Sequence, residues 1–420
     1  DSACFDGALF EGDVDFSLIK VGLNFSIIPV IKNSLEIKTI LKGNVKFGGA
    51  KIGGQFQANG AYFGDSIKII NFNGIQVEES AFFVNAVFRG QVNFVAANIM
   101  GLLDVSGAQF LNETPAAFEG IKVGSSAIFR DTIFLGNILL NHSTFTDLYI
   151  EGNYLCSLIS LLHMDSTIVQ RELRIANTKV NTFYANHLQV MGPARLINIF
   201  ITDLADFQNA SYQSLDLSNV TWPRSRNNVL LEGLTYETIS AEGNPNDCDG
   251  LLNWLKSCRF SRQPYTQLES YFLKWGHKES ADKVFIRMRQ KEVALLSWWK
   301  KWPTKILWGG LTGYGRKPYL SIPWIVLIVA LGALAFPLTF DGKTLESHLW
   351  LTQMAKSYSS TMKIILSLDR FLPGVDLGVA KYWAPPVNFC FLAWIYWYIQ
   401  KLLGWVLVPI ALAAIYTRIK

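Results

Sequence analysis

The sequence is poor in charged residues and in cysteine. Only 17% of its 420 residues are charged and half are hydrophobic, whereas a typical soluble domain carries about 25% charge. This composition excludes a disordered, collagen-like or strongly charged nucleic-acid-binding chain. The five cysteines lie far apart without CxxC spacing, so the sequence predicts neither a disulfide framework nor a zinc site. The net charge of +5 is small for this length.

Catalytic signatures are also lacking. The sequence contains no GxSxG, HExxH, P-loop or GxGxxG motif. Gly342, Lys343 and Thr344 spell the end of a P-loop without the glycine that should precede them, and the histidines are scattered. We therefore expect no catalytic residue, no metal site and no cofactor. The first ten residues lack the basic start and apolar run of a signal peptide, so we expect that the chain is processed or that an upstream part is absent.

A spacing of eleven residues recurs through the first half of the chain. The matched pairs are Gly90 and Gly101, Val92 and Leu103, Phe94 and Val105, Ala97 and Ala108, and Ile99 and Phe110. Apolar positions about five or six residues apart fit neither an amphipathic helix nor an alternating strand. They suit a β-solenoid, whose short faces send small and large residues inward while Gly, Asn and Ser turn the corners. Two units make one coil of about 22 residues, so about ten coils fit before residue 245.

The alternative to a solenoid is a β-sandwich with strands about every eight to twelve residues. Matching residue types across several columns favour the solenoid, and we predict a mainly β fold with a quadrilateral-type β-solenoid over residues 1–245. The repeat slips between residues 150 and 200. There, the sequence LCSLISLLHMDS (155–166) indicates a helical or irregular segment.

A turn-rich boundary at residues 241–250, AEGNPNDCDG, separates the repeats from a helical region. Apolar residues between Tyr265 and Trp275 follow helical spacing, and Gly276 ends that helix. A second helix is predicted from about Lys278 to Leu296. Residues 246–300 are thus expected to form an αα-hairpin linker.

Two long apolar stretches follow in residues 301–420, which we predict to be a membrane domain. The 19 residues 322–340 contain no charged residue, and a helix of this length nearly crosses a hydrocarbon core of about 30 Å. The second stretch, 387–416, is interrupted only by Gln400 and Lys401. We expect two transmembrane helices, with residues 341–386 forming an external or re-entrant connection.

Basic residues set the expected orientation. From Lys283 to Leu320 the chain carries nine Lys and Arg residues but only one acidic residue, Glu292, whereas residues 341–386 nearly balance the two signs. By the positive-inside rule, the solenoid and both flanks of the spans face the cytoplasm. We therefore expect a bacterial inner-membrane protein with a cytoplasmic N-terminal domain.

Tryptophans alternate with lysines just before the first apolar stretch. The candidate anchor residues are Trp298, Trp299, Lys300, Lys301, Trp302 and Trp308. Aromatic and basic residues together bind single-stranded nucleic acid in some proteins. Next to a membrane span they favour an interfacial anchor on anionic lipid. We therefore expect membrane lipid as a partner and no nucleic acid.

The connection contains a candidate pore segment at residues 358–378. A short apolar helix over residues 362–371 is followed by a turn at Pro373 and Gly374, the outline of a re-entrant loop. Asp369, Arg370 and Asp376 would lie at its mouth. The alternative is an interfacial helix lying flat on the outer leaflet.

Three segments carry a resemblance to a known group. Residues 263–290, residues 367–378 (SLDRFLPGVDLG) and residues 402–415 (LLGWVLVPIALAAI) resemble the C-terminal half of bacterial pentapeptide-repeat-like membrane proteins. The resemblance implies a solenoid followed by two transmembrane helices. Some members are labelled membrane-associated oxidoreductase, but the sequence shows no cofactor motif. The repeats are looser here, with Phe and Ile where tidier members keep Leu.

Two functions are expected from these features. The first is a non-enzymatic integral membrane protein whose cytoplasmic solenoid is an interaction, scaffold or assembly module, with a protein partner or further copies of the chain. The second is an oligomeric ion channel or pore, with the solenoid as gate or sensor. In such a ring, Gly332 and Gly404 would permit close helix contacts.

Overall fold

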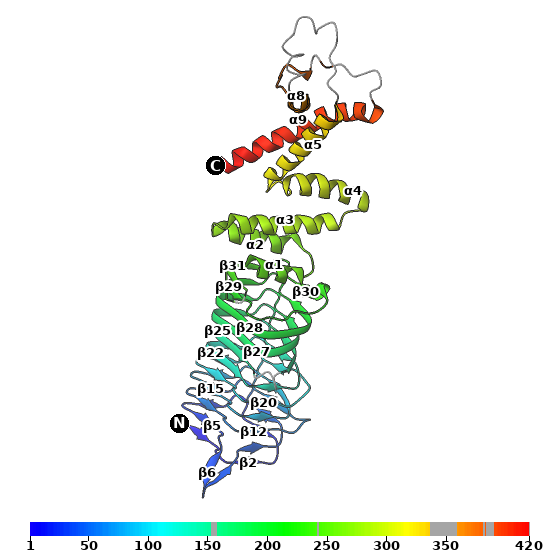
Figure 1. Cartoon of the computed structure of the whole chain (residues 1–420). Coiled ribbons are helices and arrows are strands. Elements are labelled where there is room, and N and C mark those ends of the chain that lie inside the picture. Colours follow the sequence, from blue (N-terminus) through cyan, green and yellow to red (C-terminus); the bar gives the residue numbers. More distant parts are fainter. Residues whose placement is uncertain (153–157, 242, 337–358, 381–382, 384–389, 420) are drawn as a thin grey trace, which may run out of the picture. The chain divides into compact units, whose positions relative to one another are not determined.

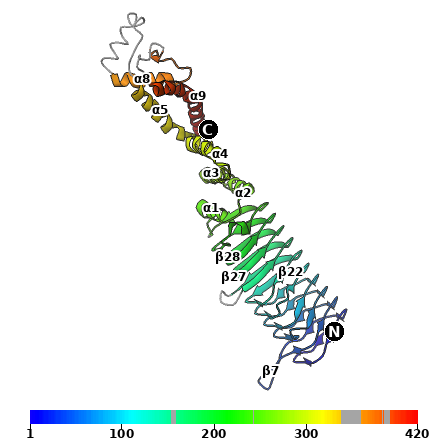
Figure 2. The same cartoon turned by 90° about the vertical axis from the view of Figure 1, so that its right-hand side faces the viewer.

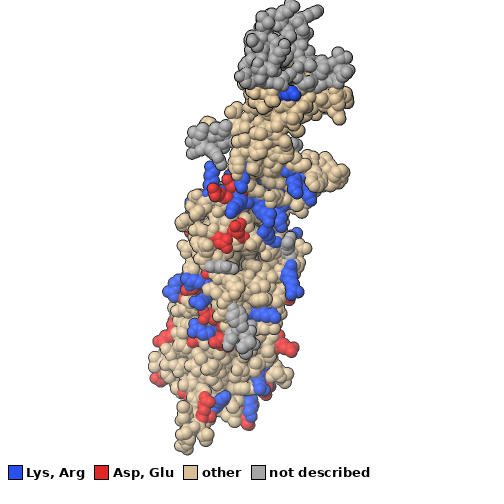
Figure 3. Space-filling view, in the orientation of Figure 1, with Lys and Arg blue, Asp and Glu red and all other residues tan. Residues whose placement is uncertain are grey.

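A computed structural model describes the chain except residues 153–157, 242, 337–358, 381–382, 384–389 and 420. The chain forms two compact units, residues 1–284 and 285–420. The first unit is a β-solenoid ended by helices, and the second consists of helices (Figure 1). In Figure 3, side chains of both charge signs are scattered over the solenoid, whereas few charged side chains appear on the described surface of the last helices in this view.

The solenoid consists of parallel strands stacked in register through about eleven turns (Figure 2). Leu103 pairs with Ala81, 22 residues earlier, and Ala194 with Leu173, 21 residues earlier. The predicted coil of about 22 residues is therefore confirmed, and the sandwich alternative is wrong. Residues eleven apart, such as Val92 and Leu103, lie in different stacks.

Each of the early coils contributes four short strands, which makes the solenoid four-sided. The first stack contains β1 (Ala3–Cys4), β5 (Phe25–Ser26), β11 (Phe56–Gln57), β15 (Ala81–Phe82) and β19 (Leu103–Asp104). The second contains β2 (Leu9–Phe10), β8 (Ile40–Leu41), β12 (Tyr62–Phe63), β16 (Val87–Phe88), β20 (Gln109–Phe110) and β23 (Ile133–Phe134). The third contains β3 (Val14–Asp15), β9 (Val45–Lys46), β13 (Ile69–Asn71), β17 (Gln91–Asn93), β21 (Ala116–Ala117) and β24 (Ile138–Leu139). The fourth contains β4 (Lys20–Val21), β10 (Lys51–Ile52), β14 (Gln76–Val77) and β18 (Asn98–Ile99).

Later coils have longer strands because neighbouring stacks merge. β22 (Lys122–Arg130) pairs with both β18 and β19, and so continues the fourth and first stacks together. The strands that follow are β25 (Thr144–Glu151), β26 (Leu158–His163), β27 (Ile168–Tyr184), β28 (Gln189–Asp206), β29 (Ser211–Asp216), β30 (Val229–Leu230) and β31 (Thr235–Ser240), with a short 3-10 helix at Arg226–Asn228. The corner between the merged stacks persists as register shifts, for example between Val190 and Pro193.

Phenylalanine rings fill the interior of the solenoid. Phe72, Phe94 and Phe118 stack in one column, with ring centroids 4.5 and 5.1 Å apart. A second column contains Phe63, Phe88, Phe110 and Phe134, at 4.8, 4.7 and 4.7 Å. Offset stacking adds about 0.5–1.5 kcal/mol per pair beyond the burial of apolar area. The recurring apolar positions of the sequence are thus the core of the fold.

Asparagine supports one corner of the later coils. Asn177, Asn198 and Asn219 all have positive φ, between 53° and 56°, a conformation that Asn tolerates better than most residues. The side-chain amide of Asn198 donates to the Oδ1 atom of Asn177 at 3.0 Å, and that of Asn219 to the Oδ1 atom of Asn198 at 2.8 Å. The Asn side chain of each coil thus forms a hydrogen bond with the Asn side chain of the coil before it.

Two departures interrupt the repeat. Phe25 and its partner Phe56 are 31 residues apart, because an antiparallel hairpin, β6 (Val30–Lys32) and β7 (Leu35–Ile37), is inserted in that coil. The helical or irregular segment expected within residues 155–166 is wrong for residues 158–163, which form β26. Ile159 pairs with Val180, and Leu162 with Ile138 and Phe183. Backbone groups of the adjacent coils offered strand partners, and this tertiary context overrode local helix propensity. Residues 153–157 lie outside the described part.

Helices close the C-terminal end of the solenoid. They are α1 (Cys248–Lys256), α2 (Arg262–Lys274) and α3 (Lys278–Ala294). The predicted αα-hairpin is confirmed as α2 and α3, with Gly276 at φ +77° between them, while α1 was not predicted. From α2, the amides of Gln263 and Gln267 donate to the carbonyl oxygens of Leu234 and Tyr236, both at 2.9 Å. These bonds satisfy strand-edge acceptors that the last coil leaves open.

The second unit contains the apolar helices. Its elements are the part of α3 from Phe285 on, α4 (Trp298–Pro303), a π-helix (Thr304–Gly310), a 3-10 helix (Pro318–Leu320), α5 (Ser321–Ala335), α8 (Ser359–Phe371) and α9 (Phe391–Ile419). Segments Pro318–Ala335 and Phe391–Leu412 are long and apolar enough to cross a membrane. They fall within or beside the predicted spans 322–340 and 387–416, of which residues 337–340 and 387–389 lie outside the described part. Leu366 and Phe371 of α8 are buried in the packing of these helices.

Candidate functional site

The tryptophan and lysine residues singled out in the sequence lie on α4 and the π-helix after it. All four tryptophans are exposed, with 75% of Trp298, 59% of Trp299, 56% of Trp302 and 61% of Trp308 accessible to solvent. The ammonium of Lys300 lies 4.7 Å from the ring centroid of Trp299. Exposed tryptophans interleaved with lysines are typical of a surface that rests in a membrane interface. The interfacial anchor remains a prediction.

Asp369, near the end of α8, is buried, and both of its carboxylate oxygens accept hydrogen bonds. Its Oδ1 atom accepts from the backbone N–H of Leu377 at 2.7 Å, and its Oδ2 atom from those of Val379 and Ala380 at 2.9 and 2.6 Å. The side chain is only 8% exposed. Asp369 therefore organises the turn that follows α8, a role that the sequence pattern did not indicate.

The other candidate pore residues have different surroundings. Asp376 is exposed, and its Oδ1 atom accepts from the N–H of Gly378 at 2.8 Å. The guanidinium carbon of Arg370 lies 4.4 Å from the ring centroid of Trp397. Pro373 and Gly374 form the expected turn, with φ +75° at Gly374. Of the three charged residues, only Asp376 is exposed.

A buried polar cluster joins α5, α8 and α9. The hydroxyl of Ser367 donates to the carbonyl oxygen of Val329 at 2.8 Å, and the amide of Gln400 donates to the Oγ atom of Ser367 at 2.7 Å. Both side chains are completely buried. Polar residues inside apolar helices join neighbouring helices because an unpaired polar group costs free energy there. The sequence did signal Gln400, which interrupts an apolar stretch, but not its partner.

Two glycines allow the three helices to approach closely. A Cβ atom on Gly404 would lie 1.7 Å from the carbonyl oxygen of Phe371, and one on Gly332 would lie 2.2 Å from the Oγ atom of Ser367. Both glycines were expected at contacts between subunits. In the structure, both glycines instead pack against α8 of the same chain.

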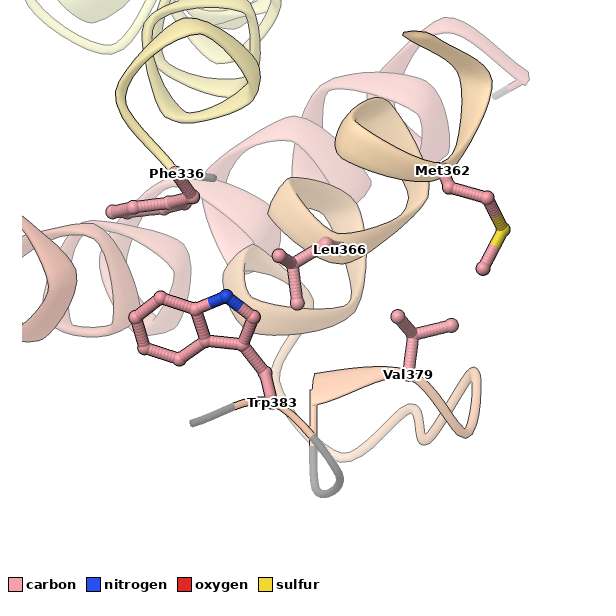
Figure 4. Packing of buried hydrophobic residues seen from close by; sticks show 5 residues of the cluster. All are labelled: Phe336, Met362, Leu366, Val379 and Trp383. Carbon is pink, nitrogen blue, oxygen red and sulfur yellow. The ribbon is translucent and has the colours of Figure 1, made fainter. Parts of the chain in front are cut away.

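Apolar packing completes this bundle. Figure 4 shows the side chains of Leu366 on α8 and Trp383 on the segment after it, both beside Phe336, which follows α5. The ring centroids of Trp383 and Trp397 are 4.2 Å apart. Because α8 packs against both apolar helices, it belongs to their bundle.

The solenoid surface carries shallow hollows along one face. One of about 350 Å³ is lined by β28, β29 and β31, and one of about 250 Å³ by β18, β22 and β25. Both follow the continuation of the fourth stack. Met100 and Met191 project from this face with 56% and 58% of their surfaces exposed. We call it the grooved face.

Reactive groups are not gathered in the described part of the chain. Among those residues, no group of three or more His, Cys, Asp or Glu side chains could hold a metal ion. Burial raises the pKa of the Cys248 and Cys258 thiols, which makes both cysteines poor nucleophiles at neutral pH.

Comparison with known proteins gives no match to a family model, a curated protein or a solved structure. The solenoid and the two apolar helices implied by the resemblance are present in the structure. Its pentapeptide repeats and oxidoreductase label gain no support from a matching family.

Proposed function

We propose that the chain is a non-enzymatic integral membrane protein that uses its solenoid as an interaction and assembly module. The observation that carries this proposal is the packed interior of the solenoid, where stacked Phe rings fill the space between the walls. A filled interior leaves the outer faces for recognition. Parallel strands in register give those faces a fixed spacing, which suits contact with another protein or a second copy of the chain.

The grooved face is the best candidate for this contact. Its exposed methionines are flexible and polarisable, and such side chains adapt to partner surfaces. Polar residues of β28, β29 and β31, among them Gln189, Ser211 and Thr235, line the same hollow as Met191. Mixed apolar and polar surface is common in protein interfaces.

The orientation and location form part of the proposal. The excess of basic residues before α5 supports a cytoplasmic solenoid at a bacterial inner membrane. Protease added to sealed right-side-out cells should spare the solenoid, whereas protease added to inverted membranes should digest it. Digestion in intact cells would overturn this orientation.

The assembly proposal is tested with the full chain in native membranes. Chemical crosslinking followed by mass measurement should detect a defined complex with itself or with a partner protein. Met191→Arg should weaken that complex, whereas Ile67→Arg, at a position 87% exposed on the solenoid, is the control. A monomer without a defined complex, or equal effects of both variants, would overturn the proposal.

An oligomeric pore is the second candidate, and one observation favours it. Ser367 and Phe371 of α8 contact Val329 and Leu407, which lie within the apolar parts of α5 and α9. If those helices span the membrane, α8 lies at membrane depth, as in a re-entrant segment. Purified protein in planar bilayers should then conduct ions, and Asp376→Asn should change the ion selectivity. Absence of conductance under all conditions would remove this candidate.

A further inference from the structure

A cleft of about 710 Å³ opens in the second unit, beside the start of the first apolar helix. Residues of α3, α4, the π-helix and the following turn line it. Its basic residues are Lys301, Lys305 and Lys317. Val293 and Leu320 provide apolar walls. The volume lies in the usual range for small-ligand sites, roughly 300–1,000 Å³.

Positive charge in this cleft is not compensated locally. Between Phe285 and Leu320 the chain has eight basic residues and one acidic residue, Glu292, which lies 2.8 Å from Arg289. The three cleft lysines form no ion pair within the described part of the chain. Lys301 and Lys317 are half-buried. Lysines that line one cleft without a counterion among the described residues repel one another, and a bound anion would offset this repulsion.

The backbone brings the three lysines together. Lys301 precedes and Lys305 lies within the π-helix, a rare structure that often occurs at functional sites. The chain then reverses at Gly313 and Tyr314, both with positive φ. The N–H of Lys317 donates to the carbonyl oxygen of Thr312 at 2.9 Å, which fixes this turn. The convergence therefore depends on specific backbone geometry.

Tyr314 adds a hydroxyl to the cleft. A Cβ atom on Gly309 would lie 3.0 Å from the Tyr314 hydroxyl oxygen, so the glycine leaves room for the ring to pack closely against the π-helix. Burial raises the pKa of Tyr314, which keeps the hydroxyl protonated and able to donate a hydrogen bond. The lining of the cleft thus includes three lysines and a tyrosine as well as apolar side chains.

We propose that this cleft binds one anionic phospholipid, with its phosphate between Lys301, Lys305 and Lys317 and the start of its acyl chains against Val293 and Leu320. Free phosphate shares the headgroup chemistry, but the apolar walls and the apolar helix that begins beside the cleft favour the lipid. This inference rests on the proposed membrane location. It does not depend on the grooved face or on assembly through the solenoid.

The test uses the full chain in lipid nanodiscs of phosphatidylcholine with or without phosphatidylglycerol. Native mass spectrometry should detect one phosphatidylglycerol molecule that stays bound after the other lipids are removed. Replacing Lys301, Lys305 and Lys317 together by Gln should weaken this binding on the order of a hundredfold, from the usual contribution of each lysine. The control replaces Arg287, Lys291 and Lys300 by Gln, which removes the same charge from the same region but outside the cleft lining.

The control also distinguishes a specific lipid site in the cleft from general electrostatic attraction between basic residues and an anionic membrane. Equal losses in the two triple variants, or no preference for phosphatidylglycerol in the unchanged protein, would overturn the proposal. Leu320→Asn should weaken retention of the lipid but not of glycerol phosphate. If inorganic phosphate alone binds as tightly as the lipid, the lipid assignment is wrong. Flotation of the protein with phosphatidylcholine vesicles tests membrane insertion separately, so failure of this inference differs from failure of the proposed location.

Discussion

The carboxylate of Asp369 accepts a hydrogen bond from the backbone N–H of Val379 at 2.9 Å, although ten residues separate the two. Two more N–H groups, of Leu377 and Ala380, complete the set. Asp369 thus holds the end of α8 and the following turn in one arrangement.

We expect Asp369→Asn to destabilise this turn. The amide nitrogen of Asn is a donor, and it would replace one of the two carboxylate oxygens that accept from the three N–H groups. Hydrogen bonds to a charged group contribute roughly 1.5–3 kcal/mol each, so thermal unfolding in detergent should show a clear loss. Asp376→Asn is the control, since the Asn oxygen can still accept from Gly378. Equal stability of the two variants would contradict the assigned role.

We expect Gly404→Ala to loosen the contact between α8 and α9. The added Cβ would overlap the carbonyl oxygen of Phe371. Such overpacking forces the backbone to shift and lowers the free energy of unfolding by about 1–3 kcal/mol. Gly310→Ala is the matched control, because its added Cβ would meet its nearest atom at 3.9 Å. The free energy of unfolding in mixed detergent measures both changes. A drop of the same size in the control would show that close packing at residue 404 is not the cause.

We expect Phe94→Ala to weaken the solenoid strongly. Phe94 is 1% exposed and lies between Phe72 and Phe118 in the stacked column, and removal of a buried Phe costs about 3–5 kcal/mol. Phe200→Ala, at a position 51% exposed, should change stability by no more than about 0.5 kcal/mol. Urea unfolding followed by circular dichroism compares them. If the variants unfold at the same urea concentration, the aromatic column is not the stabilising core.

A pH-dependent contribution is expected at Asp147. The Arg171 guanidinium, followed by the Ser126 hydroxyl, holds the pKa of this buried carboxyl below its ordinary value of 3.8. The folded state thus favours the charged carboxylate. Its stabilisation is present above the unfolded pKa and is lost as the pH falls through the lower folded pKa.

Arg171→Met should therefore destabilise the solenoid at neutral pH, with the difference from the unchanged protein shrinking as the pH falls below about 4. Lys46→Met is the control, since Lys46 and Asp15 are both more than half exposed and lie 3.8 Å apart. Unfolding measured across this pH range provides the comparison. A difference that stays constant down to low pH would contradict the linkage.

The sequence by itself determined the coil length, the apolar columns, the helical hairpin and the two apolar helices. Each depends on a local period, because a short coil places residues about 22 apart on the same wall and a helix groups residues three and four apart. Gly276 likewise ended α2 through its own backbone freedom.

Only the tertiary structure decided the remaining features. Residues 158–163 became a strand because backbone groups of adjacent coils were available to pair. Ser367 and Gln400 meet across two helices, and Asp369 binds a turn whose position depends on the packing of α8. Lys301 and Lys317 share a cleft because the chain reverses at Tyr314. The residues in these contacts are not separated by any fixed number of positions. A periodic pattern in the sequence therefore could not predict them.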